Sequence, residues 1–312
     1  MGEWAGSVRR FALTTATATA VALALAASAG AINPQVAGLQ VALRANGFYA
    51  GPIDGIAGPL TVRGVRRFQR RVGLPVDGRA GLRTRAALGP FGRPLFGRRT
   101  LRRHMFGWDV SVLQFLLARR GFDPGPIGGY MRPQTVRALR RYQRSVRLAV
   151  DGVAGPRTMA AMVLQAKVPL APGSRRVGPP TVTSPLSVRA QLDRWSAQYG
   201  VDGHLVRALA WMESGYSPSV VSKAGARGIL QLLPSTWKYV ETVLLGRRVP
   251  HSTSGQARVG VVFLRHLLIE FRGNERLALA AWYQGERSIR KRGPLRETRL
   301  FVANVLALRQ RM

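Results

Sequence analysis

A glutamate lies where the sequence predicts the buried face of a helix. Asp202 is a typical N-cap, and Val206 and Leu209 follow it at helical spacing, with Glu213 at the next position on the same face. A carboxyl that is buried without a cationic partner resists ionisation, so its pKa rises. Such a group can stay protonated near neutral pH and donate its proton to a leaving oxygen, such as that of a glycosidic bond. Glu213 is therefore a candidate general acid, unless it lies in water at the frayed helix end beside Gly215.

Other kinds of catalytic site find little support in the sequence. The chain contains no cysteine, which excludes thiolate catalysis, disulfides and cysteine–zinc modules. No phosphate-binding loop and no Gly-x-Ser-x-Gly elbow is present. The four histidines lie far apart, without a second ligand at metal spacing; they are His104, His204, His251 and His266. No metal and no cofactor is therefore expected.

The N-terminal half contains an internal repeat with an offset of 74 residues. Residues 36–87 align with residues 110–161 without a gap, and roughly 29 of the 52 aligned pairs are identical. Asp54, the one acid in the first copy's glycine- and proline-rich loop, is replaced by Gly128 in the second copy. A repeated fold that lacks a repeated reactive group favours binding over catalysis.

Each copy is expected to form three helices. Asn33 is a cap for a helix that begins at Pro34 and ends at Gly47, and Pro59 begins a second helix. A turn at Asp77-Gly78 then leads to a short third helix that ends near residue 88. Three helices of this size predict a minimal bundle in each copy.

The repeated residues resemble the small three-helix peptidoglycan-binding domain of bacterial wall enzymes. The matching pattern in the first copy is Leu39-Gln40, Gly47-Phe48, Gly51-Pro52-Ile53-Asp54-Gly55, Thr61, Phe68-Gln69, Asp77-Gly78, Gly81 and Thr84. The resemblance implies that the groove near the Gly-Pro-Ile loop binds wall glycan or stem peptide. The implied wall-binding residues are Gly51, Pro52, Ile53 and Asp54, and in the second copy Gly125, Pro126 and Ile127. The alternative is that the copies are spacers or protein-docking modules, and the loss of the family's aspartate at Gly128 weakens the ligand-binding prediction for the second copy.

The C-terminal unit, residues 186–312, shows helical spacing throughout and almost no strand signal. Three blocks resemble, in order and spacing, the soluble lytic transglycosylase catalytic domain, a lysozyme-like helical fold related to goose-type lysozyme. They are Glu213-Ser214, then Gly225-Ala226-Arg227-Gly228 continuing to Gln231 and Pro234, then Trp282-Tyr283-Gln284-Gly285. The expected architecture is therefore all-α, with two three-helix bundles and a lysozyme-like domain.

The resemblance assigns roles to these blocks. Glu213 would protonate the oxygen between N-acetylmuramic acid and N-acetylglucosamine, then accept the proton of the muramic C6 hydroxyl as a 1,6-anhydro ring closes. No second carboxylate is needed, unlike in ordinary glycosidases. Gly225 and Gly228 would let the backbone approach the glycan and Gln231 would bind sugar. Ser214 belongs to the implied substrate-binding set, and it would either orient the glutamate or end its helix.

The third block departs from the family pattern Tyr-Asn-Ala-Gly. Trp282 replaces the tyrosine and offers only an indole N–H, while Tyr283 lies one position further, about 100° around a helix. Trp282 is expected either to stack on a sugar or to belong to the core. Tyr283 and Gly285 complete the expected substrate-binding set.

The chain begins with a pattern typical of a secretion signal. Arg9 and Arg10 precede an uncharged stretch, residues 11–27, and a small-x-small cleavage pattern follows at Ala27-Ser28-Ala29. An uncleaved anchor is the alternative, and no integral membrane span is expected after signal removal. The expected organisation is signal 1–31, repeat 32–89, linker 90–107, repeat 108–166, proline-rich linker 167–185 and catalytic domain 186–312.

The composition bears on partners. The formal net charge is +34, which favours anionic partners, although arginine supplies nearly all of it. Export to the cell wall argues against nucleic acid, so peptidoglycan strands and anionic wall polymers are the expected partners. The sequence thus predicts an exported, wall-anchored lytic transglycosylase. The alternatives are a muramidase with Glu241 or Glu270 as a base, a wall-binding protein without activity, and a nucleic-acid-binding protein.

Overall fold

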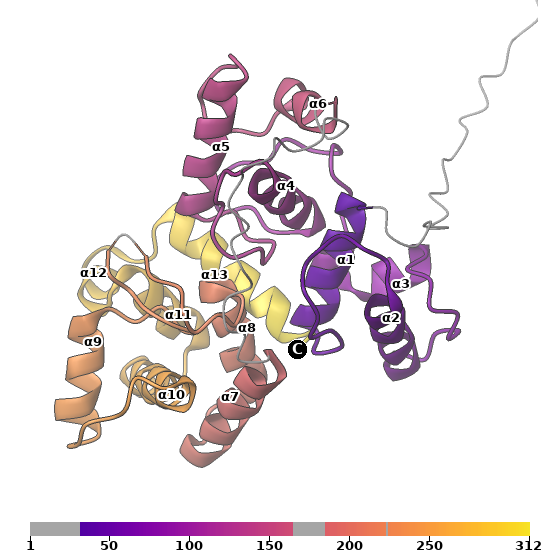
Figure 1. Ribbon diagram of the computed structural model, residues 1–312. Coiled ribbons are helices and arrows are strands. Elements are labelled where there is room, and N and C mark those ends of the chain that lie inside the picture. Colours follow the sequence, from indigo (N-terminus) through magenta and orange to yellow (C-terminus); the bar gives the residue numbers. More distant parts are fainter. Residues whose placement is uncertain (1–31, 165–184, 223) are drawn as a thin grey trace, which may run out of the picture.

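The computed structural model describes residues 32–164, 185–222 and 224–312, and helices dominate it (Figure 1). Within these ranges no strand forms and only isolated bridges pair extended residues, which confirms the all-α prediction. The first repeat contains α1 (Pro34–Ala45), α2 (Pro59–Arg71), α3 (Leu82–Ala87) and the short 3₁₀ helix η1 (Gly89–Phe91), and the second contains α4 (Trp108–Arg119), α5 (Pro133–Ser145) and α6 (Pro156–Leu164). The C-terminal unit contains α7 (Pro185–Tyr199), α8 (Gly203–Ser214), α9 (Pro234–Tyr239), the π-helix η3 (Val240–Leu244), α10 (Thr253–Glu270), α11 (Glu275–Gln284), α12 (Glu286–Arg292) and α13 (Arg296–Arg309).

Helix starts follow the predicted caps. The Asn33 side chain accepts a hydrogen bond from Gln35 N (2.9 Å), and Pro34 occupies the first turn of α1. Asp202 caps α8 in the same way, accepting from His204 N at 2.8 Å. These contacts confirm that short polar residues and prolines set the helix boundaries.

Buried glutamines explain much of the repeated sequence. In the first repeat, Gln40 Oε1 accepts hydrogen bonds from Gly55 N (2.9 Å) and Asp54 N (3.0 Å), and its amide donates to Asp54 Oδ1 (2.6 Å). In the second repeat, Gln114 Oε1 accepts from Gly128 N (3.1 Å) and the following amide in the same manner. Each glutamine therefore holds the glycine-rich loop against the first helix of its repeat. Asp54 takes part in this internal network.

The two repeats and the C-terminal unit share one continuous apolar core. Trp108 Nε1 donates to Gln35 Oε1 across the two repeats (2.6 Å). Phe91 is 1% exposed and meets the ring of Trp211 edge-on at 5.7 Å. Residues 90–107, expected to be a linker, contribute to this core, where Leu101 is fully buried. The segment lacks an apolar period because isolated side chains, and not one face of a helix, anchor it.

Helix α8 lies in the middle of the C-terminal unit. Its residues from Leu205 to Met212 are all buried, against α7 and α13 among others. Gly215, in the left-handed conformation (φ +64°), ends the helix as expected. The predicted signal peptide and residues 167–184 of the predicted second linker lie outside the described residues. None of the described helices combines the length and the hydrophobicity needed to cross a membrane.

Candidate active site

Glu213 lies in the last turn of α8, between two buried residues. Its neighbours Met212 and Ser214 are buried, while Glu213 itself keeps partial contact with solvent. Trp282, near the end of α11, donates its indole N–H to Glu213 Oε1 at 3.0 Å. The carboxyl is therefore held in place by a neutral donor and stays accessible at the surface.

Burial dominates the electrostatics of this carboxyl. It raises the pKa of Glu213 from its ordinary 4.5 to about 7, against the opposing effects of the Trp282 hydrogen bond and the positive charge of Arg132. Near neutral pH the group is thus divided between its acid and its base form. A carboxyl in this state can donate a proton and take one back.

Two other acids considered from the sequence are engaged elsewhere. Glu241 Oε1 accepts a hydrogen bond from Val249 N (2.7 Å), which lowers the pKa of this partly exposed carboxyl. Glu270 forms an ion pair with Arg290 (2.8 Å). Within the described part of the chain, the only charged side chain that acts on Glu213 is that of Arg132. The site therefore contains one acid–base carboxyl and not a pair.

Ser214 connects α8 to the glycine-rich loop that follows it. Its hydroxyl donates to Ile229 O (2.7 Å) and accepts from Ser217 N (3.1 Å), and the side chain is fully buried. Direct contact between Ser214 and substrate, as expected above, is inconsistent with this burial. The serine fixes the loop beside Glu213.

The loop itself is built by backbone contacts. Gly228 has a φ of +77°, and a Cβ at this position would lie 2.2 Å from Gln256 Oε1. That oxygen accepts from Ile229 N at 3.0 Å, so the lack of a side chain at Gly228 makes room for Gln256. The Gln231 amide donates to Val220 O and Gly228 O, both at 2.9 Å. Sequence reasoning missed Gln256, which lies on α10 outside every motif.

The other expected loop and α11 residues are placed as follows. Gly225 is partly exposed, with open space where a Cβ would point. Tyr283 stacks on Phe301 at 4.5 Å and forms no hydrogen bond with Glu213 among the contacts of the described residues. Gly285 is exposed and ends α11 with a φ of +91°. Trp282, and not Tyr283, therefore supplies the donor to the carboxyl.

The second repeat reaches the catalytic helix. Arg132 Nη2 donates to Trp211 O (3.0 Å) and Met212 O (2.6 Å), and Trp211 Nε1 donates to Gly128 O (2.9 Å). Arg132 was not identified from the sequence. The signal that could have found it is the difference between the copies, because the first copy has Gly58 at this position. The expected wall-binding residues Gly125, Pro126 and Ile127 belong to this same loop, where Ile127 packs against the core.

The corresponding loop of the first repeat is held by hydrogen bonds within that repeat. Tyr49 donates its hydroxyl to Pro52 O (2.6 Å), and Arg44 donates to Gly51 O. Pro52 is exposed, while Ile53 and Asp54 are partly buried. The loop thus presents apolar and backbone atoms at its surface. Its aspartate, Asp54, already accepts a hydrogen bond from Gln40.

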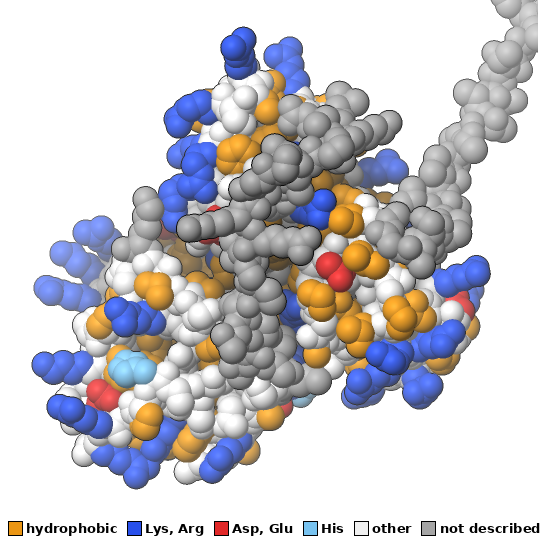
Figure 2. All heavy atoms as spheres, in the orientation of Figure 1, with side chains coloured by type: hydrophobic (Ala, Val, Ile, Leu, Met, Phe, Trp, Pro, Cys, Tyr) orange, Lys and Arg blue, Asp and Glu red, His pale blue; other side chains and the backbone are white. Residues whose placement is uncertain are grey.

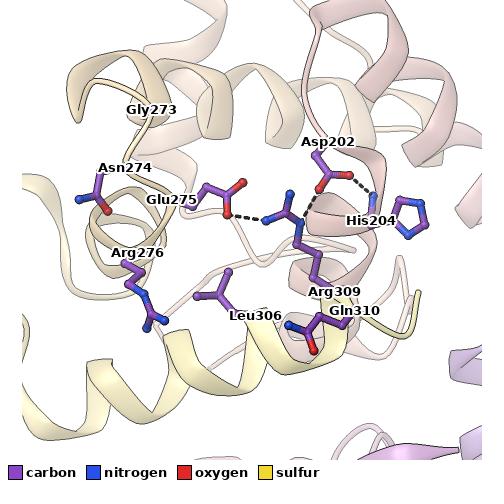
Figure 3. Close-up of a pocket in the computed structure, with 9 residues that line it drawn as sticks. All are labelled: Asp202, His204, Gly273, Asn274, Glu275, Arg276, Leu306, Arg309 and Gln310. Atoms are coloured by element: carbon purple, nitrogen blue, oxygen red, sulfur yellow. Dashed lines mark hydrogen bonds and ion pairs between the residues drawn. The ribbon is translucent and has the colours of Figure 1, made fainter. Parts of the chain in front are cut away.

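A surface pocket of about 750 Å³ lies at the opposite end of α8 (Figure 3). Arg309 bridges Asp202 and Glu275 within it, so one guanidinium pairs with both carboxylates. Asp202 and Glu213 are separated by roughly 16 Å along the helix, at 1.5 Å per residue. The pocket is therefore separate from the candidate acid Glu213.

Fold and site together define an all-helical domain that contains a glutamate with a raised pKa, joined to two small helical bundles. A family model described as "Putative peptidoglycan binding domain" matches residues 33–88 and 107–162, and the model of the "Transglycosylase SLT domain" matches residues 191–300. The chain thus contains two peptidoglycan-binding domains followed by a transglycosylase SLT domain.

Known proteins show similarity to parts of the chain. N-acetylmuramoyl-L-alanine amidase CwlM of Mycobacterium tuberculosis is 41% identical over 102 residues, which cover 31% of this chain and 25% of that protein. Endo-type membrane-bound lytic murein transglycosylase A of Klebsiella pneumoniae is 50% identical over 44 residues, 14% of this chain and 22% of that protein. The chain spans about a quarter of the length of these relatives. The solved structure of an inactive mutant of the lytic transglycosylase Slt from Pseudomonas aeruginosa aligns with a TM-score of 0.38 and 18% identity, over 89% of this chain and 57% of that one.

Proposed function

We propose that the protein is a wall-bound, extracytoplasmic lytic transglycosylase that cleaves peptidoglycan glycan strands. The observation that carries this proposal is the isolation of Glu213, a carboxyl with a pKa of about 7 on which no second acid acts within the described ranges. A single group that serves first as acid and then as base fits an intramolecular reaction. Hydrolysis by the usual two-acid route calls for a second carboxylate.

Protonated Glu213 donates to the oxygen that links N-acetylmuramic acid to N-acetylglucosamine, and the bond from muramic C1 to that oxygen breaks. The muramic C6 oxygen then bonds to C1 and releases its proton to the glutamate. Glu213 therefore gives up one proton and regains one, and no water is consumed. The Trp282 N–H steadies the carboxylate between these steps, because it donates to Oε1.

The repeats are proposed to keep the enzyme on its insoluble substrate, which raises the local concentration of cleavable bonds. Figure 2 shows lysine and arginine side chains projecting over α5 and α2. Several of these arginines are exposed, which suits contact with anionic wall polymers; they are Arg63, Arg66, Arg67, Arg70 and Arg71 on α2 and Arg140, Arg141 and Arg144 on α5.

The test is mass spectrometry of the products released from purified peptidoglycan. Wild type is expected to release muropeptides one water lighter than hydrolysis products, and Glu213→Gln to release none. Glu241→Gln is the matched control, because this partly exposed carboxyl is bonded to Val249 N and should be dispensable. Ordinary reducing ends would show that the enzyme is a hydrolase. Equal release by wild type and Glu213→Gln would refute the assigned role of the glutamate.

A further inference from the structure

The two copies of the repeat differ at the first, third and fifth residues of a five-residue loop stretch. In the second copy this stretch lies beside α8, the helix that carries Glu213. With the 74-residue offset, Asp54, Ile56 and Gly58 become Gly128, Tyr130 and Arg132. Gly128 O accepts from Trp211 Nε1, and Arg132 donates to the last carbonyls of α8. The Arg132 guanidinium also lies 5.6 Å from the centre of the Tyr130 ring.

The contact is close because two glycines meet. A Cβ at Gly128 would lie 3.7 Å from Gly215 Cα and 3.6 Å from Arg132 Nη1. A side chain at this position would therefore lie between the loop, the guanidinium and the helix end. Gly128 leaves the backbones of the loop and of Gly215 in direct contact.

Arg132 is held in a fixed position at this contact. Its Nη2 bonds to Trp211 O and Met212 O, while Nε and Nη1 are shielded from solvent and have no partner within the described residues. A cation at the C-terminal end of a helix interacts favourably with the carbonyls there. Trp211 O also accepts from Gly215 N, and the two carbonyls that Arg132 contacts belong to the residues just before Glu213, so the guanidinium holds the turn that carries the acid.

Several other titratable groups surround this carboxyl. Tyr130 comes from the second repeat and Tyr283 from α11, and both are close enough for the Glu213 charge to contribute to their raised pKa values, which burial dominates. A second layer of Arg103, His104 and Glu297 lies beside these tyrosines. Arg132 is the one cation among them that acts directly on Glu213.

We propose that Arg132 is a positioning residue for Glu213, supplied by the second repeat, whose glycine-rich loop serves the catalytic helix. The inference rests on the proposed function only in treating Glu213 as the acid. Two consequences follow for Arg132→Met. The ionised carboxylate loses its nearby positive charge, and the last turn of α8 loses two hydrogen bonds.

The test is a pH titration of Glu213 by ¹³C NMR of glutamate-labelled protein, with the resonance assigned from its absence in Glu213→Gln. In Arg132→Met the pKa of Glu213 is expected to rise by about one pH unit, the lower end of the effect of a close opposite charge. Arg132→Lys keeps the charge and should restore the wild-type titration to within a few tenths of a unit. Because this readout needs no activity, it is independent of whether the protein is a transglycosylase.

Arg120→Met is the matched control for packing. Arg120 also lies in the second repeat, donates to the backbone carbonyls of Leu116 and Met162, and lies over the ring of Tyr142, yet it is not among the residues that act on Glu213. An unmoved titration in Arg132→Met, or an equal shift in Arg120→Met, would overturn the proposal. Should Arg132→Met not fold, Arg132→Gln is measured and interpreted in the same way.

Discussion

Replacing Glu213 by glutamine is expected to stabilise the folded protein above neutral pH. In the unfolded chain this carboxyl has its ordinary pKa of 4.5, whereas in the folded protein burial raises the pKa to about 7. The folded state therefore binds a proton that the unfolded state has already released. The associated stability is present below the unfolded pKa and is lost as pH rises through the folded pKa.

The magnitude follows from the two pKa values. At 1.36 kcal/mol per pKa unit, the interval from 4.5 to about 7 corresponds to roughly 3 kcal/mol. Glutamine carries no charge at any pH and keeps an oxygen for the Trp282 N–H. Glu213→Gln should therefore be about 3 kcal/mol more stable than wild type at about pH 8, with the difference disappearing below about pH 4.5.

Urea unfolding of both proteins at about pH 4, 6 and 8 measures this difference directly. Glu241→Gln controls for loss of a carboxylate as such, because the partly exposed Glu241 carboxyl has a lowered pKa and its neutralisation does not stabilise the fold. A Glu213→Gln protein that is less stable than wild type at about pH 8, or a difference that does not change with pH, would refute the burial argument.

Three further predictions concern the same region. Trp282→Phe removes the hydrogen bond to Glu213 Oε1, so the pKa of Glu213 should rise and the alkaline limb of the kcat/KM profile should move about one pH unit higher. Gly228→Ala should destabilise the protein by about 2 kcal/mol or more in urea titrations, because its Cβ collides with Gln256 at a φ of +77°. Phe91→Ala should cost about 3–5 kcal/mol in the same assay and leave a single unfolding transition, because Phe91 lies in the shared core.

Local features of the fold could be predicted because their causes are local. Asn33 and Asp202 cap their helices through bonds to backbone groups two residues away, and Gly215 ends α8 in a conformation that glycine adopts readily. Helical spacing alone was enough to place Glu213 on the buried surface of α8.

The partners of polar side chains could not be predicted in the same way. Ser214 and Gln231 occupy motif positions next to the acid, but both bond to backbone carbonyls that only the folded loop brings near. The exact packing of Phe91 and Leu101 depends on helices that are remote in sequence. The role of Arg132 depends on the docking of the second repeat onto α8, which no pattern within the repeat encodes.

The shared core limits how this chain can be recombined. A module joined only by a tether can be deleted, duplicated or exchanged without harm to its neighbours. Removing the second repeat here would expose Trp211 and take away the hydrogen bonds that Arg132 donates to Trp211 O and Met212 O. The first repeat contacts the C-terminal unit too, through Arg189 Nη1 and Ala45 O at 2.7 Å. The three domains are therefore expected to be gained, lost or exchanged together and not one at a time.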